Sequence, residues 1–185
     1  MSVRWKVAVA AGVVALGAAV VVGTSAQAAD ARDEPDPAAC LDEQEAAFLE
    51  LINDHRAEHD VEPLEASKTL NVASYGHSED MADNDYFDHE SQDGRQPEDR
   101  MEDAGYDGSP TGENIAAGYP TAEEAFEVWR ESDGHNENML DEDFAVIGIG
   151  LAENDDSEYE QYWTTDFGGD VDAAPDCGDD SGHDR

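Results

Sequence analysis

The sequence contains few positively charged residues. Only 9 of its 185 residues are lysine or arginine, against 47 aspartates and glutamates, which gives a formal net charge of -38. A surface with this charge repels polyanions, so the composition argues against binding to nucleic acid or to anionic lipid. Phosphate-binding functions are disfavoured for the same reason.

Long apolar runs are also scarce. The only one, residues 7–22, follows two basic residues and is short for a membrane span. Ala26 and Ala28 then supply the small residues of a cleavage site, as in an export signal. We therefore predict that residues 1–28 are a signal peptide, that the mature protein is secreted, and that no integral membrane segment remains after cleavage. The alternative is an uncleaved N-terminal anchor.

Cysteine occurs only twice, at Cys40 and Cys177, and the two positions bracket nearly all of the foldable sequence. In an exported protein a single pair of cysteines is typical of a disulfide, so we predict a Cys40–Cys177 bond. Closing a loop of this length stabilises the fold by about 4 to 5 kcal/mol in the chain-entropy model. The alternative is a reactive or metal-bound pair of thiols.

Several motifs of well-defined chemistry are missing from the sequence. It has no glycine-rich phosphate loop, no HExxH motif and no aromatic-basic nucleic-acid surface. A calcium-loaded protein would explain the acidity, but aspartate-rich stretches such as residues 83–85 lack the glycine and terminal glutamate of an EF-hand loop. Molar salt shortens the screening length to about 3 Å and so relieves charge repulsion. We therefore interpret the acidic composition as that of a halophilic protein.

One domain is predicted between two acidic ends. Residues 29–40 form an acidic linker that contains proline, and residues 170–185 form an acidic tail with hardly any apolar residue. Both compositions are typical of segments outside a packed core. The domain is therefore expected to span residues 41–169, without internal repeats.

Helical signals come first in this domain. Apolar residues recur at helical spacing in residues 42–59, and again after Ser67, which has the chemistry of an N-cap. A third helix is expected to begin at Thr121, where Glu124 would complete a capping box, and to end at Gly134.

Strand signals come last. Residues 90–111 contain several glycines and prolines and are expected to be loop, with one short helical turn in residues 98–104. Residues 145–152 and 158–167 are rich in β-branched and aromatic side chains and are expected to pair as an antiparallel hairpin. Helices followed by strands, without βαβ alternation, predict the α+β class.

A set of motifs in this domain resembles one family. In chain order the motifs are Asn53-x-x-Arg56, Leu64, Leu70, Ala73, His77-Ser78-x-Asp80-Met81, Tyr86-Phe87-x-His89, Asp93-Gly94, Gly105-Tyr106, Gly112-Glu113-Asn114-Ile115, Trp129, Ser132-x-Gly134-His135-x-x-Asn138-x-Leu140, Gly148-x-Gly150 and Tyr162-Trp163. They are similar to those of a bacterial or archaeal member of the CAP superfamily, which includes cysteine-rich secretory proteins, antigen 5 and plant pathogenesis-related proteins. The resemblance covers roughly residues 43–168. It implies a three-layer α-β-α sandwich with a small antiparallel sheet.

The resemblance also implies a cleft that gathers two histidines and two acids. By motif, His89 and His135 match the two histidines, and Glu113 matches the first acid. In many members the second acid lies just after the tryptophan, and Glu131 is the residue available for this fourth corner. His77 lies on the apolar stripe of the second predicted helix and is assigned to the core, with a supporting role behind the site as the alternative. We expect solvent exposure for the remaining histidines, His55, His59 and His183.

These residue types suit a divalent metal such as Zn²⁺, since two neutral imidazoles can hold the ion while a carboxylate orients a bound water or accepts its proton. Without metal, Glu113 would stabilise a histidinium, and it remains open that these side chains only hydrogen-bond loops together. We predict a monomeric binding module for an extracellular ligand, which is an envelope glycan, a peptide or a lipid. The alternative is a metal-assisted, peptidase-like hydrolase with His89 and His135 as ligands and Glu113 and Glu131 as catalytic carboxylates. A third alternative is an extracellular scaffold.

Overall fold

A computed structural model describes residues 39–175 and 177 of the protein. The predicted signal peptide, most of the predicted linker and residues 178–185 of the predicted tail lie outside the described residues. Within the part of the chain that is described, no helix combines the length and the apolar composition needed to cross a bilayer.

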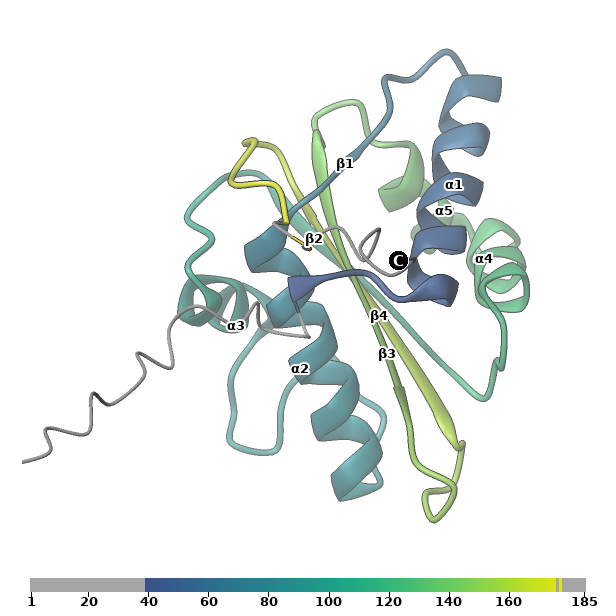
Figure 1. Ribbon diagram of the computed structural model, residues 1–185, viewed down its shortest axis with the longest axis vertical. Helices are drawn as coiled ribbons and strands as arrows, with labels where there is room; N and C mark the ends of the chain where they lie inside the picture. The colour runs from purple at the N-terminus through teal and green to yellow at the C-terminus, as the bar shows by residue number, and fades with distance from the viewer. Residues whose placement is uncertain (1–38, 176, 178–185) are drawn as a thin grey trace, which may run out of the picture. The chain divides into compact units, whose positions relative to one another are not determined.

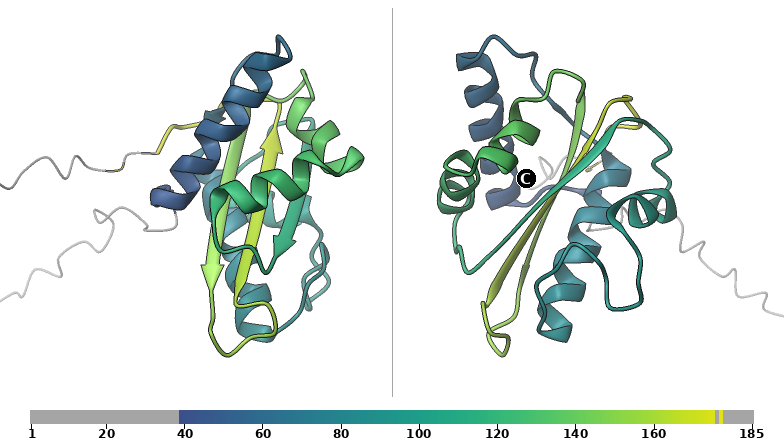
Figure 2. Two further views of the ribbon diagram at one scale, coloured as in Figure 1. Left: turned by 90° about the vertical axis from the view of Figure 1, so that its right-hand side faces the viewer. Right: turned by 180° about the vertical axis from the view of Figure 1, so that it is seen from behind.

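The domain is built of three layers (Figure 1). A four-stranded sheet lies in the middle layer. One of its faces is covered by α2 (Lys68–Asn84) and α3 (Pro97–Ala104), and the other by α1 (Glu43–Glu58), α4 (Ala122–Arg130) and α5 (Asp133–Leu140), as Figure 2 shows from two further sides. This arrangement confirms the α+β class and the α-β-α sandwich.

The strand order in the sheet is β1-β3-β4-β2. The predicted hairpin is present as β3 (Val146–Glu153) and β4 (Gln161–Gly168), which pair antiparallel. On the other side of β4 lies β2 (Thr111–Ala117), also antiparallel, and β1 (Glu65–Ala66) pairs parallel with β3. The long strands are therefore antiparallel, but the short β1 makes the sheet mixed. The strand β2 forms one edge of the sheet.

The predicted helix starts are confirmed by their caps. Asp42 accepts a hydrogen bond from the Glu45 N–H at 2.7 Å, and Glu45 accepts one in return from the Asp42 N–H at 2.8 Å. Ser67 caps α2 by accepting from the Leu70 N–H at 3.1 Å. Each side chain satisfies a backbone donor that the first helical turn leaves without an internal partner.

The end predicted for the third helix was wrong. The helix that Thr121 caps, α4, ends at Arg130, and Gly134 lies inside the separate helix α5. The break occurs at Ser132, whose backbone is extended, with φ of -101° and ψ of 119°. The chain therefore turns between α4 and α5, which brings His135 back toward the sheet.

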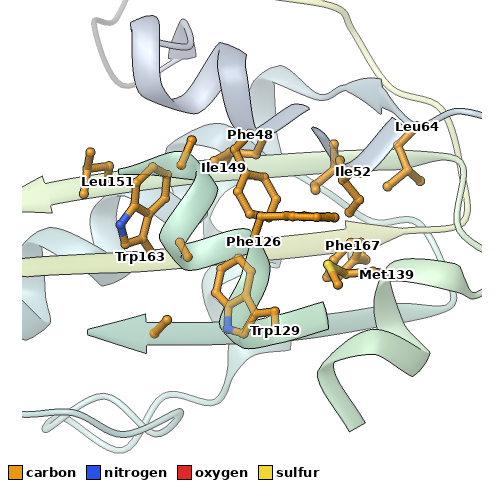
Figure 3. Close-up of a cluster of buried hydrophobic side chains, with 14 of the residues drawn as sticks. Phe48, Ile52, Leu64, Phe126, Trp129, Met139, Ile149, Leu151, Trp163 and Phe167 are labelled. Carbon is orange, nitrogen blue, oxygen red and sulfur yellow. The ribbon is translucent and has the colours of Figure 1, made fainter. Parts of the chain in front are cut away.

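The largest apolar cluster fills the space between α1, α4 and the sheet (Figure 3). The ring of Phe48 lies at its centre, with centroids 5.2 Å from the Trp129 ring and 6.0 Å from the Trp163 ring. Both tryptophans are completely buried. Their contacts with Phe48 hold α4 and β4 against α1. Because α5 follows α4 in the chain, it lies on the same face of the sheet.

The predicted disulfide between Cys40 and Cys177 is confirmed, with 5.7 Å between the two Cα atoms. Its neighbours are also attached to α2. The Ala39 carbonyl accepts from the Asn71 side chain, and the Ala173 carbonyl accepts from the Lys68 N–H, each at 3.1 Å. The bond therefore links two terminal segments that already lie against the start of α2.

Candidate functional site

The candidate site is built around the edge strand β2. Side chains of a strand alternate between the two faces of the sheet. Glu113 and Ile115 point toward α2 and α3, where Ile115 packs in a cluster with residues of α2. Asn114 and Ala116 point to the opposite face, and the Asn114 amide donates to the His135 carbonyl at 3.1 Å. Groups from both faces of the sheet therefore converge on one strand.

The Glu113 side chain is held by partners on both of its oxygens. His89 Nδ1 lies 2.6 Å from Oε1, and Arg100 Nη2 donates to Oε2 at 2.5 Å. Only 3% of the Glu113 side chain is exposed, whereas 50% of the His89 side chain is exposed. The structure thus brings two of the predicted site residues together, with the carboxylate inside and the imidazole at the surface.

Arg100 was not predicted as a site residue. It lies on α3, is 5% exposed, and its ion pair with Glu113 is almost entirely shielded from water. Its Nη1 group donates to the His89 carbonyl at 2.9 Å and to the Ser91 hydroxyl at 3.2 Å. Arg100 therefore fixes both the carboxylate and the loop that carries His89.

Asp166 is the second group that the sequence interpretation missed. It lies directly opposite Glu113 in the β2–β4 register and is 1% exposed. Ser74 donates to its Oδ2 at 2.9 Å, while its Oδ1 is buried without a hydrogen-bond partner among the described residues. Burial, followed by the negative charge of Glu113, raises the pKa of Asp166 well above its ordinary value, so the protonated form of this carboxyl is favoured.

We expect Asp166→Asn to preserve the fold and to gain stability relative to the wild type as the pH rises. Folding raises the pKa of this carboxyl. Its contribution to the free energy of unfolding is therefore most favourable below the ordinary pKa of aspartate, and that contribution is lost as the pH rises toward the raised pKa. Asparagine donates and accepts in the same place but does not titrate. Denaturant unfolding of both proteins at a series of pH values should show a difference that grows by up to about 1.4 kcal/mol per pH unit.

The control for this comparison is Asp143→Asn, which removes an exposed carboxylate in the loop between α5 and β3. Its stability should follow that of the wild type across the same pH range. Parallel curves for Asp166→Asn and the wild type would show that Asp166 is ionised in the folded protein.

The tautomer of His89 follows from its contact with Glu113. Nδ1 donates to the carboxylate, so Nε2 is the ring nitrogen available to a ligand. The hydrogen bond to Glu113 raises the pKa of His89 above its ordinary value, although partial burial opposes this effect. The site therefore favours an imidazolium in this position.

His135 lies on α5, on the other side of β2. Burial lowers the pKa of its imidazole, and the nearby positive charge of His89 lowers it further. Its ring nitrogen Nδ1 is buried without a hydrogen-bond partner among the described residues. The structure thus places His135, where the neutral ring is favoured, within electrostatic reach of His89, where the imidazolium is favoured.

His77 lies completely within the core, as predicted, but it also contacts the loop that carries His89. Its Nε2 donates to the carbonyl of Asp88 at 3.0 Å. Burial lowers the pKa of His77 to about 4, so the ring is neutral. The prediction that His55 is solvated was wrong, because it is 8% exposed and its Nε2 lies 2.8 Å from the Asn136 side-chain oxygen.

Glu131, the candidate for the fourth corner, follows directly after α4 as its C-cap. Its side chain is exposed and makes no hydrogen bond or ion pair with another described residue. The carboxyl residue beside Glu113 is instead Asp166. It belongs to β4 and not to the segment after Trp129.

The donor set fits a metal centre poorly. Among residues 39–175 and 177, no three His, Cys, Asp or Glu side chains are grouped so that they could share a metal ion. Each oxygen of Glu113 already has a partner, His89 on one and Arg100 on the other, so a metal would compete with these contacts. A metal could use at most the two imidazoles, and His89 would first have to lose its proton.

Both missed residues had a signal in the sequence. Arg100 is one of the few basic residues in a strongly acidic chain, where a buried cation needs a dedicated acidic partner. Asp166 is the single acid in Thr164–Phe167, between residues typical of a buried strand. The sequence alone could not predict the register of β2 with β4, which places the carboxyls of Glu113 and Asp166 opposite each other.

Known proteins share this architecture. Residues 49–167 match the cysteine-rich secretory protein (CAP) family. Two curated relatives from Bacillus subtilis are similar: YkwD, 37% identical over 66% of this chain and 46% of its own length, and the membrane protein YlbC, 36% identical over 58% and 31%. The chain therefore spans less than half the length of either relative.

Two solved structures have the same fold. An extracellular protein containing an SCP domain from Bacillus anthracis is 30% identical, with a TM-score of 0.61 over 68% of this chain and 40% of its own. An outer surface protein from Borrelia burgdorferi is 20% identical, with a TM-score of 0.64 over 71% of this chain and 97% of its own, and shows the fold alone. Because the family match covers more than half of the sequence and the folds agree, the chain belongs to the cysteine-rich secretory protein (CAP) family.

Proposed function

We propose that the protein is an extracellular binding module that holds its ligand at His89. The extracellular assignment is supported by the predicted export signal and by the similar structure from Bacillus anthracis, which is described as an extracellular protein. The ligand is a component of the cell envelope, since an exported protein meets this material first.

The observation that carries the proposal is the saturation of Glu113. Its carboxylate is buried, with an arginine on one oxygen and a histidine on the other. A general base must be free to accept a proton from substrate or water, and this carboxylate is not. Glu113 is arranged instead to fix His89, whose half-exposed ring can then donate from Nε2 to an acceptor on a ligand.

A metal-assisted, peptidase-like hydrolase is the second candidate. Its support is the His89–Glu113 pair, because histidines that bind metals commonly donate their other ring N–H to a carboxylate. If a divalent metal such as Zn²⁺ is bound, His89 Nε2 and His135 would hold it. The ion would supply a bound water of lowered pKa. Glu113 would keep the His89 ring in place.

The proposal is tested by binding of the full chain to isolated envelope material in molar KCl, where the charge of -38 is screened. We expect His89→Ala to weaken binding at least about tenfold, since it removes the only exposed polar group held by Glu113. The matched control is His59→Ala, at the C-cap of α1, which removes an exposed histidine outside the site. Equal binding by His89→Ala and the wild type would refute the proposal.

The hydrolase is tested on the same samples by release of new amino groups, with Zn²⁺ added or removed by chelation. Release that requires Zn²⁺ and is lost in the His89→Ala, His135→Ala double variant would establish the second candidate. Release that persists when His89, His135 and Glu113 are all alanine would exclude this site as its origin.

A further inference from the structure

We propose that the outer edge of β2, at the end that contains Ala117, binds an extended peptide with positive charge and one apolar side chain. This inference narrows the ligand class of the proposed function and therefore rests on that function. Its basis is the coincidence of three features along one strand: free backbone groups, an apolar groove and exposed carboxylates.

The first feature is the direction of the backbone groups. The Gly118 N–H donates to the Gln161 carbonyl at 2.8 Å, which places the even-numbered residues of this strand in the hydrogen-bonded pairs with β4. The backbone groups of Glu113, Ile115 and Ala117 therefore point away from β4. In the part of the chain that the structure describes, no further strand lies beyond β2 (Figure 2).

Some of these outward groups already have partners. The carbonyl of Glu113 accepts from the Asn138 amide at 3.3 Å, and that of Ile115 accepts from the Trp129 indole at 3.1 Å. Ala117 differs, because neither its N–H nor its carbonyl has a hydrogen-bond partner within residues 39–175 and 177. A residue that offers both groups outward presents the pairing unit of an antiparallel ladder, which another peptide chain satisfies with its own backbone and an acyl chain does not.

The main chain of Glu113 is partly exposed to solvent. Its side chain is almost fully buried, yet the residue as a whole is only half-buried. The exposed part of Glu113 is therefore its main chain. Partly exposed main chain therefore occurs at both Glu113 and Ala117, about 13 Å apart in a strand, whereas the three residues between them are buried.

The second feature is an apolar groove of about 250 Å³ along this edge, which we call the edge groove. Its floor is formed by Ile115, Ala116 and Ala117 of β2. Val128 and Trp129 line it from α4, and His135 lines it from α5. The groove is large enough for one aliphatic or aromatic side chain of a ligand.

Two exposed aromatic residues complete the edge groove. Phe87 is 43% exposed and Tyr159 is 40% exposed, and their ring centroids lie 6.1 Å apart. They come from the loop after α2 and from the β3–β4 turn, so they meet beside the end of β2. Exposed aromatic pairs of this kind are uncommon on a surface that is otherwise charged, and they provide large contact areas in binding sites.

The third feature is the charge around the two rings. Asp88 follows Phe87, and Glu158 and Glu160 flank Tyr159, all with exposed side chains. A ligand with basic side chains on either side of an apolar residue would meet these carboxylates. An acidic peptide would be repelled by them and by the net charge of the whole chain.

These features define the position of the peptide relative to His89. A peptide residue whose backbone pairs with Ala117 places its side chain near Phe87 and Tyr159. The backbone four residues further along then lies beside Glu113 and His89, where a peptide carbonyl can accept from His89 Nε2. The aromatic end therefore selects the ligand, and His89 fixes its position.

The test uses a synthetic library of acetylated and amidated heptapeptides, with lysine at alternate positions and varied residues between them. Binding to the full chain is measured in molar KCl and at lower salt. We expect members with one aromatic or large aliphatic residue to bind, and to bind more weakly as salt is added. Phe87→Ala and Tyr159→Ala should each weaken binding about tenfold, whereas Val171→Ala, which truncates an exposed apolar side chain elsewhere, should have no effect.

Backbone pairing is tested separately by Ala117→Pro. Proline is tolerated on an edge strand where the N–H faces outward, and it removes the donor. We expect this variant to keep the wild-type thermal unfolding but to lose peptide binding. If it unfolds early, N-methylation of the best peptide at successive positions tests the same bond from the ligand side, with loss at one position expected and equal binding at all positions contradicting strand pairing.

Chitotetraose and phosphatidylcholine vesicles serve as the probes for the other ligand classes. Binding of either one that depends on Phe87 and Tyr159, without any peptide binding, would overturn the inference. If envelope binding is lost in His89→Ala while no peptide binds, the proposed function stands and the peptide inference fails. If peptides bind at the edge groove and His89→Ala binds envelope normally, the proposed role of His89 fails instead.

Discussion

Replacing Arg56 by alanine is expected to prevent stable folding of the domain. Arg56 is completely buried, and its guanidinium donates to four backbone carbonyls, at 2.7 to 3.1 Å: those of Glu62, Met139, Asp141 and Phe144. Hydrogen bonds from a charged group contribute about 1.5 to 3 kcal/mol each, and alanine leaves every acceptor without its donor. A loss on the order of 5 kcal/mol or more is comparable to the whole stability of many domains.

The measurement is thermal or denaturant unfolding in molar KCl, with Arg130→Ala as the control. Arg130 is an exposed arginine on α4 whose ion pair with Glu127 lies at the surface, and its removal should leave the stability close to that of the wild type. Arg56→Lys should lie between the two, because an ammonium keeps the charge but cannot reach carbonyls in four directions. Similar stabilities for Arg56→Ala and Arg130→Ala would show that the acceptors find other donors.

Arg56 also explains how a helix far from it in sequence is positioned. Three of its four acceptors lie at the end of α5 and in the connection to β3. The same connection determines where α5, and with it His135, lies against β2. The motif Asn53-x-x-Arg56 indicated a family position, but the sequence alone could not show that its arginine serves as the anchor of α5.

The elements with strong local signals were predicted correctly. The first two helices have apolar stripes and Asp42 or Ser67 as caps, and the β3–β4 hairpin has β-branched and aromatic residues around a polar turn. In these segments the local preference and the tertiary structure agree. The boundaries therefore follow from the sequence to within a few residues.

The elements that were missed have weak local signals. The β2 sequence, TGENIAA, is made largely of residues with low strand propensity, and it is a strand because β4 pairs along its whole length. The short helix α5 contains Gly134, Asn136 and Asn138, which are poor helix formers, and it is stabilised by contacts such as those of Asn114 and Arg56. Since the candidate site lies on β2 and α5, its geometry could not be predicted even though His89, Glu113 and His135 could be named.

A second large effect is expected at Gly150 on β3. A Cβ atom built there overlaps the main chain of Ser74 and Tyr75 in α2, and one built at Gly148 overlaps the main chain of Leu70. The two glycines lie on the face of β3 that α2 covers, so α2 rests directly on the strand backbone. Because α2 lies this close to β3, the Ser78 hydroxyl can donate to the Gly150 carbonyl at 2.9 Å.

Gly150→Ala should therefore push α2 away from the sheet and destabilise the domain by about 3 kcal/mol, at the upper end of ordinary overpacking, because main-chain atoms cannot rotate aside. Gly76→Ala is the matched control within α2 itself. No atom lies within 4 Å of a Cβ built at Gly76, and alanine in a helix interior should stabilise by about 0.5 to 1 kcal/mol. Denaturant unfolding should give shifts of opposite sign for the two changes. A small loss for Gly150→Ala would mean that α2 can move outward freely.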